Sequence, residues 1–129
     1  MKTPDMFRLD GLVAVVTGGA RALGYQHALA LAEAGADVAI CDLLEEEGKL
    51  ASQEIAESTG QRTFFGKADV TAPEQIDSFI ADVTAELGPI DILVNNAARP
   101  SEGVALEKVD DNLWRQIIDI DLSSVFYFG

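Results

Sequence analysis

Short apolar runs alternate with longer helical patterns along this chain. The first run, residues 12–16, is apolar at every position, which is typical of a strand that helices cover on both faces. Residues 23–34 follow with Ala and Leu at a helical spacing, and Gly35 stands where a left-handed C-terminal cap would lie. This pattern predicts parallel α/β structure.

The same alternation continues to the end of the sequence. We expect strands at residues 38–41, 63–65 and 90–94, and helices at residues 45–59, 71–87 and from about 110 onward. Thr71 and Glu74 match a capping box, so Thr71 is the expected N-cap of the middle helix, with Glu74 reaching back to it. That helix carries one continuous apolar stripe, made of Ile76, Phe79, Ile80, Val83 and Leu87.

The connections between these elements predict the order of the strands. Right-handed crossovers with the usual ordering place them as 3-2-1-4, the first half of a doubly wound parallel sheet that stops after the fourth strand and its following helix. The 129 residues leave room for one domain, residues 1–129. An apolar edge strand is prone to association. We therefore expect either that another segment or partner covers residues 92–94, or that the protein has a longer chain.

The net charge of the chain narrows the classes of partner that it could bind. The sequence has 22 acidic and 9 basic residues, a net charge of -13, and the basic residues form no stripe. Such a surface repels nucleic acid and anionic lipid. The longest uncharged stretch, residues 22–32, is too short for a membrane span of roughly 18 apolar residues.

Cysteine and histidine usage argues against disulfides and metal sites. Cys41 is the single cysteine, and His27, the single histidine, has no thiol or carboxylate cluster near it at a metal-ligand spacing. The first ten residues lack the apolar stretch of a signal peptide. We therefore expect a cytoplasmic protein without a metal.

A glycine-rich turn joins the first strand to the first helix. The segment runs Thr17-Gly18-Gly19-Ala20-Arg21-Ala22-Leu23-Gly24. Free amide groups and the helix dipole make such a turn an anion site, and glycines let the backbone approach a pyrophosphate. A purely structural glycine turn is the alternative.

The end of the second strand supplies the expected partner of this turn. Asp42 stands where a carboxylate accepts hydrogen bonds from the ribose diol of adenosine. A carboxylate there repels a 2'-phosphate, so NAD is favoured over NADP, and Leu43 adds no compensating base. Arg21 could instead pair with a phosphate or stay solvated. An ordinary exposed acid is the alternative for Asp42.

The third and fourth strands end in further polar and small residues. Asp69 could accept a hydrogen bond from an adenine amino group, and the small residues Ala97 and Ala98 leave room for a ribose. Because the carboxyl ends of parallel strands share one edge, these residues are expected to face one crevice. The alternatives are an Asx turn at Asp69 and a strand-end hydrogen bond at Asn95.

Together these motifs resemble those of the short-chain dehydrogenase/reductase family. The resemblance rests on the glycine turn, Asp42, Asp69-Val70-Thr71, Asn95-Asn96-Ala97-Ala98 and residues 114–122, and covers essentially the whole chain. It implies a Rossmann fold, a nicotinamide cofactor and hydride transfer between an alcohol and a ketone. By position it assigns to the cofactor surface Gly18, Arg21, Leu23, Asp42, Leu43, Asp69, Val70, Asn96, Ala97, Ala98 and Ile120.

Three positions depart from the family pattern. Ala22 replaces the middle glycine of TGxxxGxG, and its methyl group should weaken cofactor binding. Ala98 replaces the glycine of NNAG, which is a milder change. Asp121 stands where the family has a catalytic asparagine that shapes a helix bend and helps hold a water in a proton relay.

The resemblance also implies residues that these 129 positions do not supply. The family's catalytic serine and its YxxxK pair lie beyond residue 129 in the usual layout, and neither Tyr25 nor Tyr127 has a lysine four residues later. We therefore expect the cofactor-binding half of an oxidoreductase, inactive by itself and oligomeric. The alternatives are a nucleotide-binding or partner-binding module without catalysis, and a remnant that binds nothing.

Overall fold

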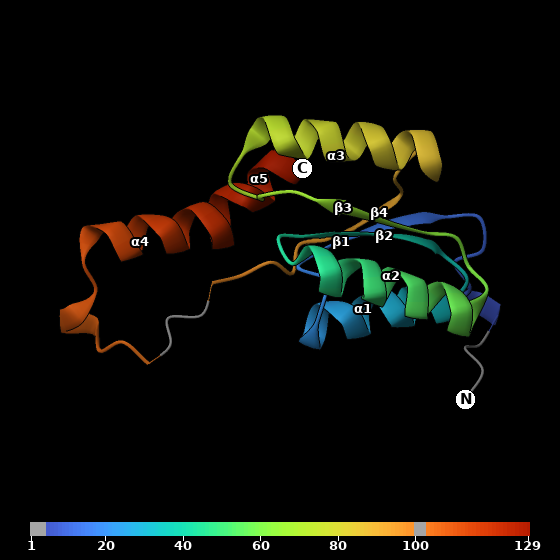
Figure 1. Cartoon of the computed structure of the whole chain (residues 1–129), viewed down its shortest axis with the longest axis horizontal. Helices are drawn as coiled ribbons and strands as arrows, with labels where there is room; N and C mark the ends of the chain where they lie inside the picture. The colour runs from blue at the N-terminus through green and yellow to red at the C-terminus, as the bar shows by residue number, and fades with distance from the viewer. Residues whose placement is uncertain (1–4, 100–102) are drawn as a thin grey trace.

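The computed structural model describes residues 5–99 and 103–129 and shows a sheet between two layers of helices (Figure 1). Residues 1–4, part of the segment considered for a signal peptide, lie outside this description. The elements follow in the order η1 (Asp5–Phe7), β1 (Val13–Thr17), α1 (Ala22–Glu33), β2 (Asp37–Asp42), α2 (Glu45–Thr59), β3 (Thr63–Lys67), α3 (Pro73–Glu86), β4 (Ile92–Val94), η2 (Leu106–Lys108), α4 (Asp111–Ile118), η3 (Asp119–Ser123) and α5 (Ser124–Phe128).

The four strands form one parallel sheet in the order β3-β2-β1-β4. Val15 of β1 is in register with Ala39 of β2 on one side and Leu93 of β4 on the other. Every residue of β1 is buried, as its uninterrupted apolar run predicted. The predicted fold class and strand order are confirmed.

Helices cover both faces of the sheet. Helices α1 and α2 lie on one face, and α3 and α5 lie on the other (Figure 1). Ala28 and Ala32 of α1 are almost fully buried, and their small side chains let this helix lie close to the strands. On the opposite face Phe79 and Val83 of α3 fill the core.

The capping box predicted at the start of α3 is wrong. The helix begins at Pro73, with Ala72 as N-cap and no side-chain cap. The hydroxyl of Thr71 instead donates to Asp69 Oδ1 at 2.7 Å. Proline at the first helical position fixes the entry angle of the chain, and Thr71 stays in the preceding turn.

The C-terminal helix is less regular than its apolar spacing predicted. It begins at Asp111, capped by the Asp110 carboxylate, which accepts from the Leu113 amide at 2.8 Å. It then passes through the π-helical segment η3 into α5. Helix α4 projects away from the sheet (Figure 1), and none of its residues is buried. The predicted single helix is therefore interrupted by a π turn.

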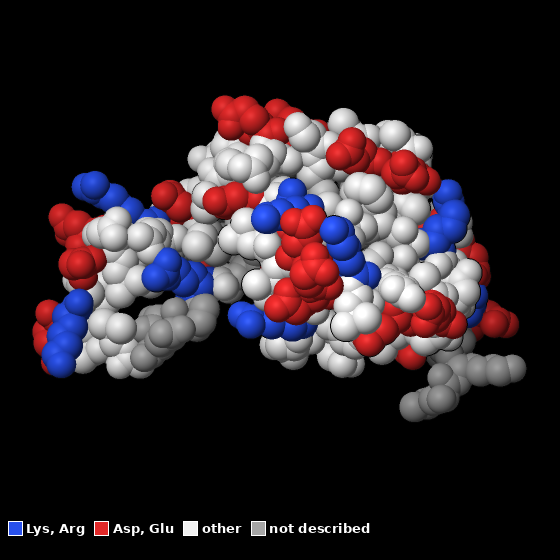
Figure 2. Space-filling model, viewed as in Figure 1, with Lys and Arg blue, Asp and Glu red and all other residues white. Residues whose placement is uncertain are grey.

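The surface matches the charge of the sequence. Acidic side chains gather over α3 in Figure 2, while lysines and arginines stand singly or in small groups. Within the described part of the chain, no helix combines the length and the apolar character needed to cross a membrane.

Candidate functional site

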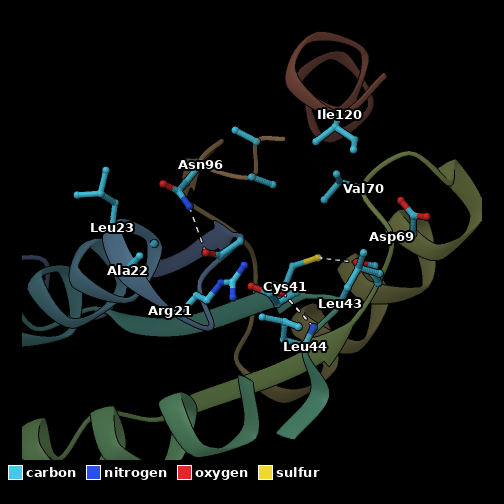
Figure 3. A pocket seen from close by; sticks show the side chains of 16 residues that line it. Arg21, Ala22, Leu23, Cys41, Leu43, Leu44, Asp69, Val70, Asn96 and Ile120 are labelled. Carbon is cyan, nitrogen blue, oxygen red and sulfur yellow. Dashed lines mark hydrogen bonds between the residues drawn. The ribbon is translucent and has the colours of Figure 1, made fainter. Parts of the chain in front are cut away.

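A cleft of about 660 Å³ opens at the carboxyl ends of the strands (Figure 3). All the residues assigned to the cofactor surface from the sequence line it, namely Gly18, Arg21, Leu23, Asp42, Leu43, Asp69, Val70, Asn96, Ala97, Ala98 and Ile120. They come from segments spread over about a hundred residues. The parallel topology brings them together, because every strand of a parallel sheet ends at the same edge.

The glycine turn leaves amide groups free at the start of α1. The first α-helical hydrogen bond joins the Tyr25 amide to the Arg21 carbonyl at 3.2 Å, so the three amides before Tyr25 have no partner inside the helix. Arg21 is the N-cap, and its side chain makes no capping hydrogen bond. The amides and the positive end of the helix dipole make this end of the cleft suited to an anion.

Two glycines let the turn fold back on the helix. Gly18 has a φ of +66°, which glycine adopts without strain. A Cβ atom at Gly24 would lie 2.0 Å from the Gly18 carbonyl oxygen and 2.6 Å from Asn96 Nδ2. Side chains at these two positions would therefore force the turn, the helix and the end of β4 apart.

Asn96 holds the turn from the neighbouring strand. Its Nδ2 donates to the carbonyl oxygens of Thr17 and Gly18, both at 3.1 Å. Asn96 lines the cleft as predicted, but its side-chain amide is committed to the backbone of the turn. These hydrogen bonds therefore fix the shape of the turn in the absence of a ligand.

Thr17 is a structural residue of the site that the sequence analysis did not single out. Its side chain is buried, and Oγ1 accepts hydrogen bonds from the amides of Asn96 and Ala97, each at 3.0 Å. The hydroxyl thereby ties the end of β1 to the segment after β4. The available signal was a hydroxyl residue at the first position of the glycine turn.

Asp42 lies at the end of β2 with its carboxylate held by two backbone groups. Oδ2 accepts from the Ala20 amide and Oδ1 from the Leu44 amide, each at 3.0 Å. These bonds orient the carboxylate beside the glycine turn. Each oxygen keeps a further acceptor position, so the group can still bind a hydroxyl.

The third strand contributes the Asx turn that the sequence analysis kept as an alternative. Asp69 Oδ1 accepts from the amide and the hydroxyl of Thr71, at 2.8 and 2.7 Å. Val70 lies beside Ile120 of η3 on the same side of the cleft (Figure 3). The π-helical segment thus brings an apolar residue to the wall opposite the glycine turn.

Asp121 is not among the residues that line the cleft. Its Oδ1 accepts from the Arg99 amide at 2.8 Å, which ties η3 to the segment after β4. The Arg99 side chain also donates to Gln116 of α4. The side chain of Asp121 therefore positions backbone rather than facing the cleft.

Ala22 and Gly24 of the predicted glycine turn also line the cleft. Three further lining residues were not predicted because they are apolar or small, namely Cys41, Leu44 and Ala68. Burial, together with the smaller effect of the nearby Asp42 and Asp69 carboxylates, raises the pKa of the Cys41 thiol to about 12. The thiol stays protonated at neutral pH, so Cys41 acts as part of the apolar wall and not as a nucleophile.

The family model of short chain dehydrogenases matches residues 12–128. The chain belongs to the short-chain dehydrogenase family. It is 35% identical to a 3-oxoacyl-[acyl-carrier-protein] reductase of Chlamydia muridarum over 88% of this chain and 45% of that protein. It is 36% identical to a 3-alpha-(or 20-beta)-hydroxysteroid dehydrogenase of Mycobacterium tuberculosis over 92% of this chain and 44% of that protein. The chain thus spans about half the length of these curated relatives.

Solved structures of short-chain dehydrogenases share the fold. L-Sorbose reductase from Gluconobacter frateurii, complexed with NADPH and L-sorbose, matches with a TM-score of 0.88 and 26% identity over 95% of this chain and 46% of that one. A short-chain type dehydrogenase/reductase from Mycobacterium marinum matches with a TM-score of 0.89 and 35% identity over 96% of this chain and 48% of that one.

Proposed function

We propose that the cleft binds a nicotinamide dinucleotide and that the whole protein is an oxidoreductase. The reaction class is hydride transfer between the nicotinamide and a small alcohol or ketone. The observation that carries the proposal is the pairing of two binding elements in one cleft: free amides at the start of α1 and the oriented carboxylate of Asp42. One suits a diphosphate and the other a ribose diol.

The shape of the turn supports the same ligand. A Cβ at Gly18 would lie 3.0 Å from Ala97 Cα, so both neighbouring segments approach here without side chains between them. Ala97 and Ala98 on the opposite side are small as well. Backbone can therefore lie directly against a sugar or phosphate, while Asp69 provides an acceptor for an adenine amino group.

The Asp42 carboxylate favours NAD over NADP in this proposal. A 2'-phosphate placed at the ribose hydroxyls would face the negative charge of Asp42, and Leu43 beside it supplies no base. The described complex of L-sorbose reductase contains NADPH. The preference proposed for this chain therefore rests on its own Asp42. Among the described residues that line the cleft, Arg21 is the one with a cationic side chain.

Titration calorimetry with NAD⁺ and NADP⁺ tests the cofactor preference. We expect the wild-type chain to bind NAD⁺ at least about tenfold more tightly, a difference of about 1.4 kcal/mol. Asp42→Asn, which keeps an acceptor oxygen and removes the charge, should bring the two dissociation constants close together.

Glu46→Gln is the matched control, because it removes one negative charge from an exposed residue of α2 outside the cleft. It should leave the ratio of the two dissociation constants unchanged. Tighter binding of NADP⁺ by the wild type contradicts the preference, and the absence of binding to either dinucleotide contradicts the function itself.

The cleft supplies the cofactor half of the proposed chemistry. When bound, the nicotinamide would accept or donate the hydride. We propose that Asp121 positions the cleft wall through its bond to the Arg99 amide, as a residue at the family's asparagine position. The substrate pocket, and the acid or base that acts at the substrate oxygen, are part of the proposal for the whole protein. No residue of this chain is assigned to them.

We further propose that the chain associates with itself through α4 and α5. The continuous segment of α4, η3 and α5 exposes Trp114 (59%), Leu122 (63%) and Phe126 (82%), and exposed apolar side chains favour association. Sedimentation velocity should show a mass that rises with protein concentration, and Phe126→Ser should shift the chain toward the monomer.

Leu50→Gln provides the comparison for the association experiment. Leu50 is 56% exposed on α2, away from the C-terminal helices. This substitution should leave the concentration dependence unchanged. A wild-type chain that stays monomeric at all concentrations contradicts the proposed association.

A further inference from the structure

Strand β3 is an edge strand of the sheet. In the order β3-β2-β1-β4 it pairs with β2 only, and among the described residues no strand lies on its other side. Just before the strand, the Arg62 carbonyl accepts from the Val38 amide at 3.1 Å. Just after it, the Ala68 amide donates to the Asp42 carbonyl at 3.3 Å. The two ends of β3 thus show which residues turn their backbone groups toward β2.

The backbone of β3 carries a row of hydrogen-bonding groups that point away from the sheet. Successive residues of a strand direct their amide and carbonyl groups alternately to its two sides. Because residues 62 and 68 bond to β2, residues 64 and 66 face β2 as well. The backbone groups of Thr63, Phe65 and Lys67 therefore face outward. Such a row is a template on which another extended segment can add a strand.

A groove of about 490 Å³ follows this edge between β3 and α3. Phe64 and Phe79 supply much of its apolar lining, with ring centroids 6.2 Å apart. Phe65 also lines the groove, although its ring lies on the other face of the sheet, against Gly48 of α2. The groove therefore follows the open edge of the strand. It shares no lining residue with the cleft that we propose for the dinucleotide.

The charges along the groove indicate which kind of segment fits it. Glu74 and Asp82 of α3 line it, and both are exposed. Lys67, the one cationic residue of the lining, lies 3.6 Å from the Glu45 carboxylate, which offsets its charge. Figure 2 shows acidic side chains over α3. A basic segment is therefore attracted to this edge, whereas a second copy of the chain paired here would bring two sets of acids together.

We propose that this groove binds an extended basic segment of a partner protein, which adds a strand to β3. The backbone of the segment would bond to the outward groups of β3. Its lysine or arginine side chains on the α3 side would lay their apolar stems along Phe64 and Phe79. Their charged ends would then reach Glu74 and Asp82. The site is separate from the dinucleotide cleft and does not depend on the proposed function.

Fluorescence anisotropy with a labelled short peptide of alternating lysine and valine tests the proposal on the whole chain. We expect saturable binding that weakens as salt is added. One control peptide has glutamate in place of lysine, and a second keeps the lysines but has methylated backbone nitrogens. Both should bind at least roughly tenfold more weakly, because the first reverses the charge and the second removes the backbone donors. Equal binding of either control overturns the proposal.

Hydrogen exchange measured by NMR locates the bound peptide on the strand. Addition of the lysine–valine peptide should slow the exchange of the Thr63, Phe65 and Lys67 amides, which face outward. The amides of Phe64 and Gly66 already face β2, so their exchange should change little. Protection that does not alternate along β3, or that appears only on other elements, contradicts strand addition.

Two substitutions at Lys67 separate the backbone contact from the charge. Lys67→Pro removes an outward donor and leaves the bonds to β2 in place, because proline is tolerated at an edge. Lys67→Thr removes the same charge and keeps the donor. We expect the proline variant to bind the peptide roughly tenfold more weakly than the threonine variant. Equal affinities overturn the proposal, and should the proline variant not fold, the exchange measurement on the wild type still decides.

Asp82→Asn and Asp77→Asn test the charge contact on one helix. Asp82 lines the groove, whereas Asp77 is exposed on α3 outside it. Asp82→Asn should weaken peptide binding roughly threefold, and Asp77→Asn should change it less. Equal effects would mean that the net charge of the chain attracts the peptide without a site. If the peptide does not bind and Lys67→Pro instead lowers self-association in sedimentation velocity, the occupant is a second copy and the proposal is overturned.

Discussion

Replacing Gly24 by alanine is expected to lower the free energy of unfolding by about 3 kcal/mol. The new Cβ would lie 2.0 Å from the Gly18 carbonyl oxygen and 2.6 Å from Asn96 Nδ2. The first of these atoms belongs to the backbone and cannot rotate away. The turn must then separate from α1, which would also disrupt the proposed dinucleotide site.

Urea denaturation of Gly24→Ala measures this loss, and Leu23→Ala is the neighbouring control. Leu23 is 69% exposed in the same turn of α1, so its truncation should change the free energy of unfolding by less than about 0.5 kcal/mol. A Gly24→Ala chain as stable as the wild type would contradict the tight packing of the turn against the helix. Alanine has a higher helix propensity than glycine, but this gain is smaller than the expected loss. It could not by itself restore the stability of the wild type.

Thr17→Val is expected to lower the free energy of unfolding by about 2 kcal/mol, although the two side chains have nearly the same shape. The Thr17 hydroxyl accepts from the amides of Asn96 and Ala97, at 3.0 Å each, in a buried position. Valine leaves both donors without that acceptor. We also expect weaker NAD⁺ binding, because the freed segment carries cleft residues.

Thr17→Ser separates the hydrogen bonds from the packing. Serine keeps the hydroxyl and removes one methyl group, which should lower the free energy of unfolding by about 0.8 kcal/mol and preserve NAD⁺ affinity. Both variants can be compared by urea denaturation and calorimetry. A serine variant that loses more stability than the valine variant contradicts the proposed role of the hydroxyl.

Most of the scaffold could be predicted from local patterns. The uninterrupted apolar run of β1 predicted a strand that is buried at every position. The spacing of Ile76, Phe79 and Val83 predicted the buried face of α3. Crossover handedness then fixed the strand order. Burial repeats with the period of each element, so the sequence records it directly.

Local motifs were less reliable where one polar group had more than one possible hydrogen-bond partner. Thr71 and Glu74 have the spacing of a capping box, yet the Thr71 hydroxyl bonds to Asp69 and the helix begins at Pro73. The apolar spacing after Asp110 is helical throughout and gave no sign of the π turn in η3. Such choices depend on small differences in free energy between alternative hydrogen bonds.

The sequence by itself determined the layered fold and the edge of the sheet where the cleft lies, which follow from periodicity and from the shared direction of parallel strands. Its resemblance to the family predicted most of the residues that line the cleft. Only the tertiary structure decided which hydrogen bonds and backbone conformations those residues adopt. Thr17 and Asn96 are 79 positions apart and become hydrogen-bond partners, and the positive φ of Ala22, +50°, is visible only in the backbone. Contacts between distant segments leave no periodic trace in a sequence, because they form only when packing of the elements brings the segments together.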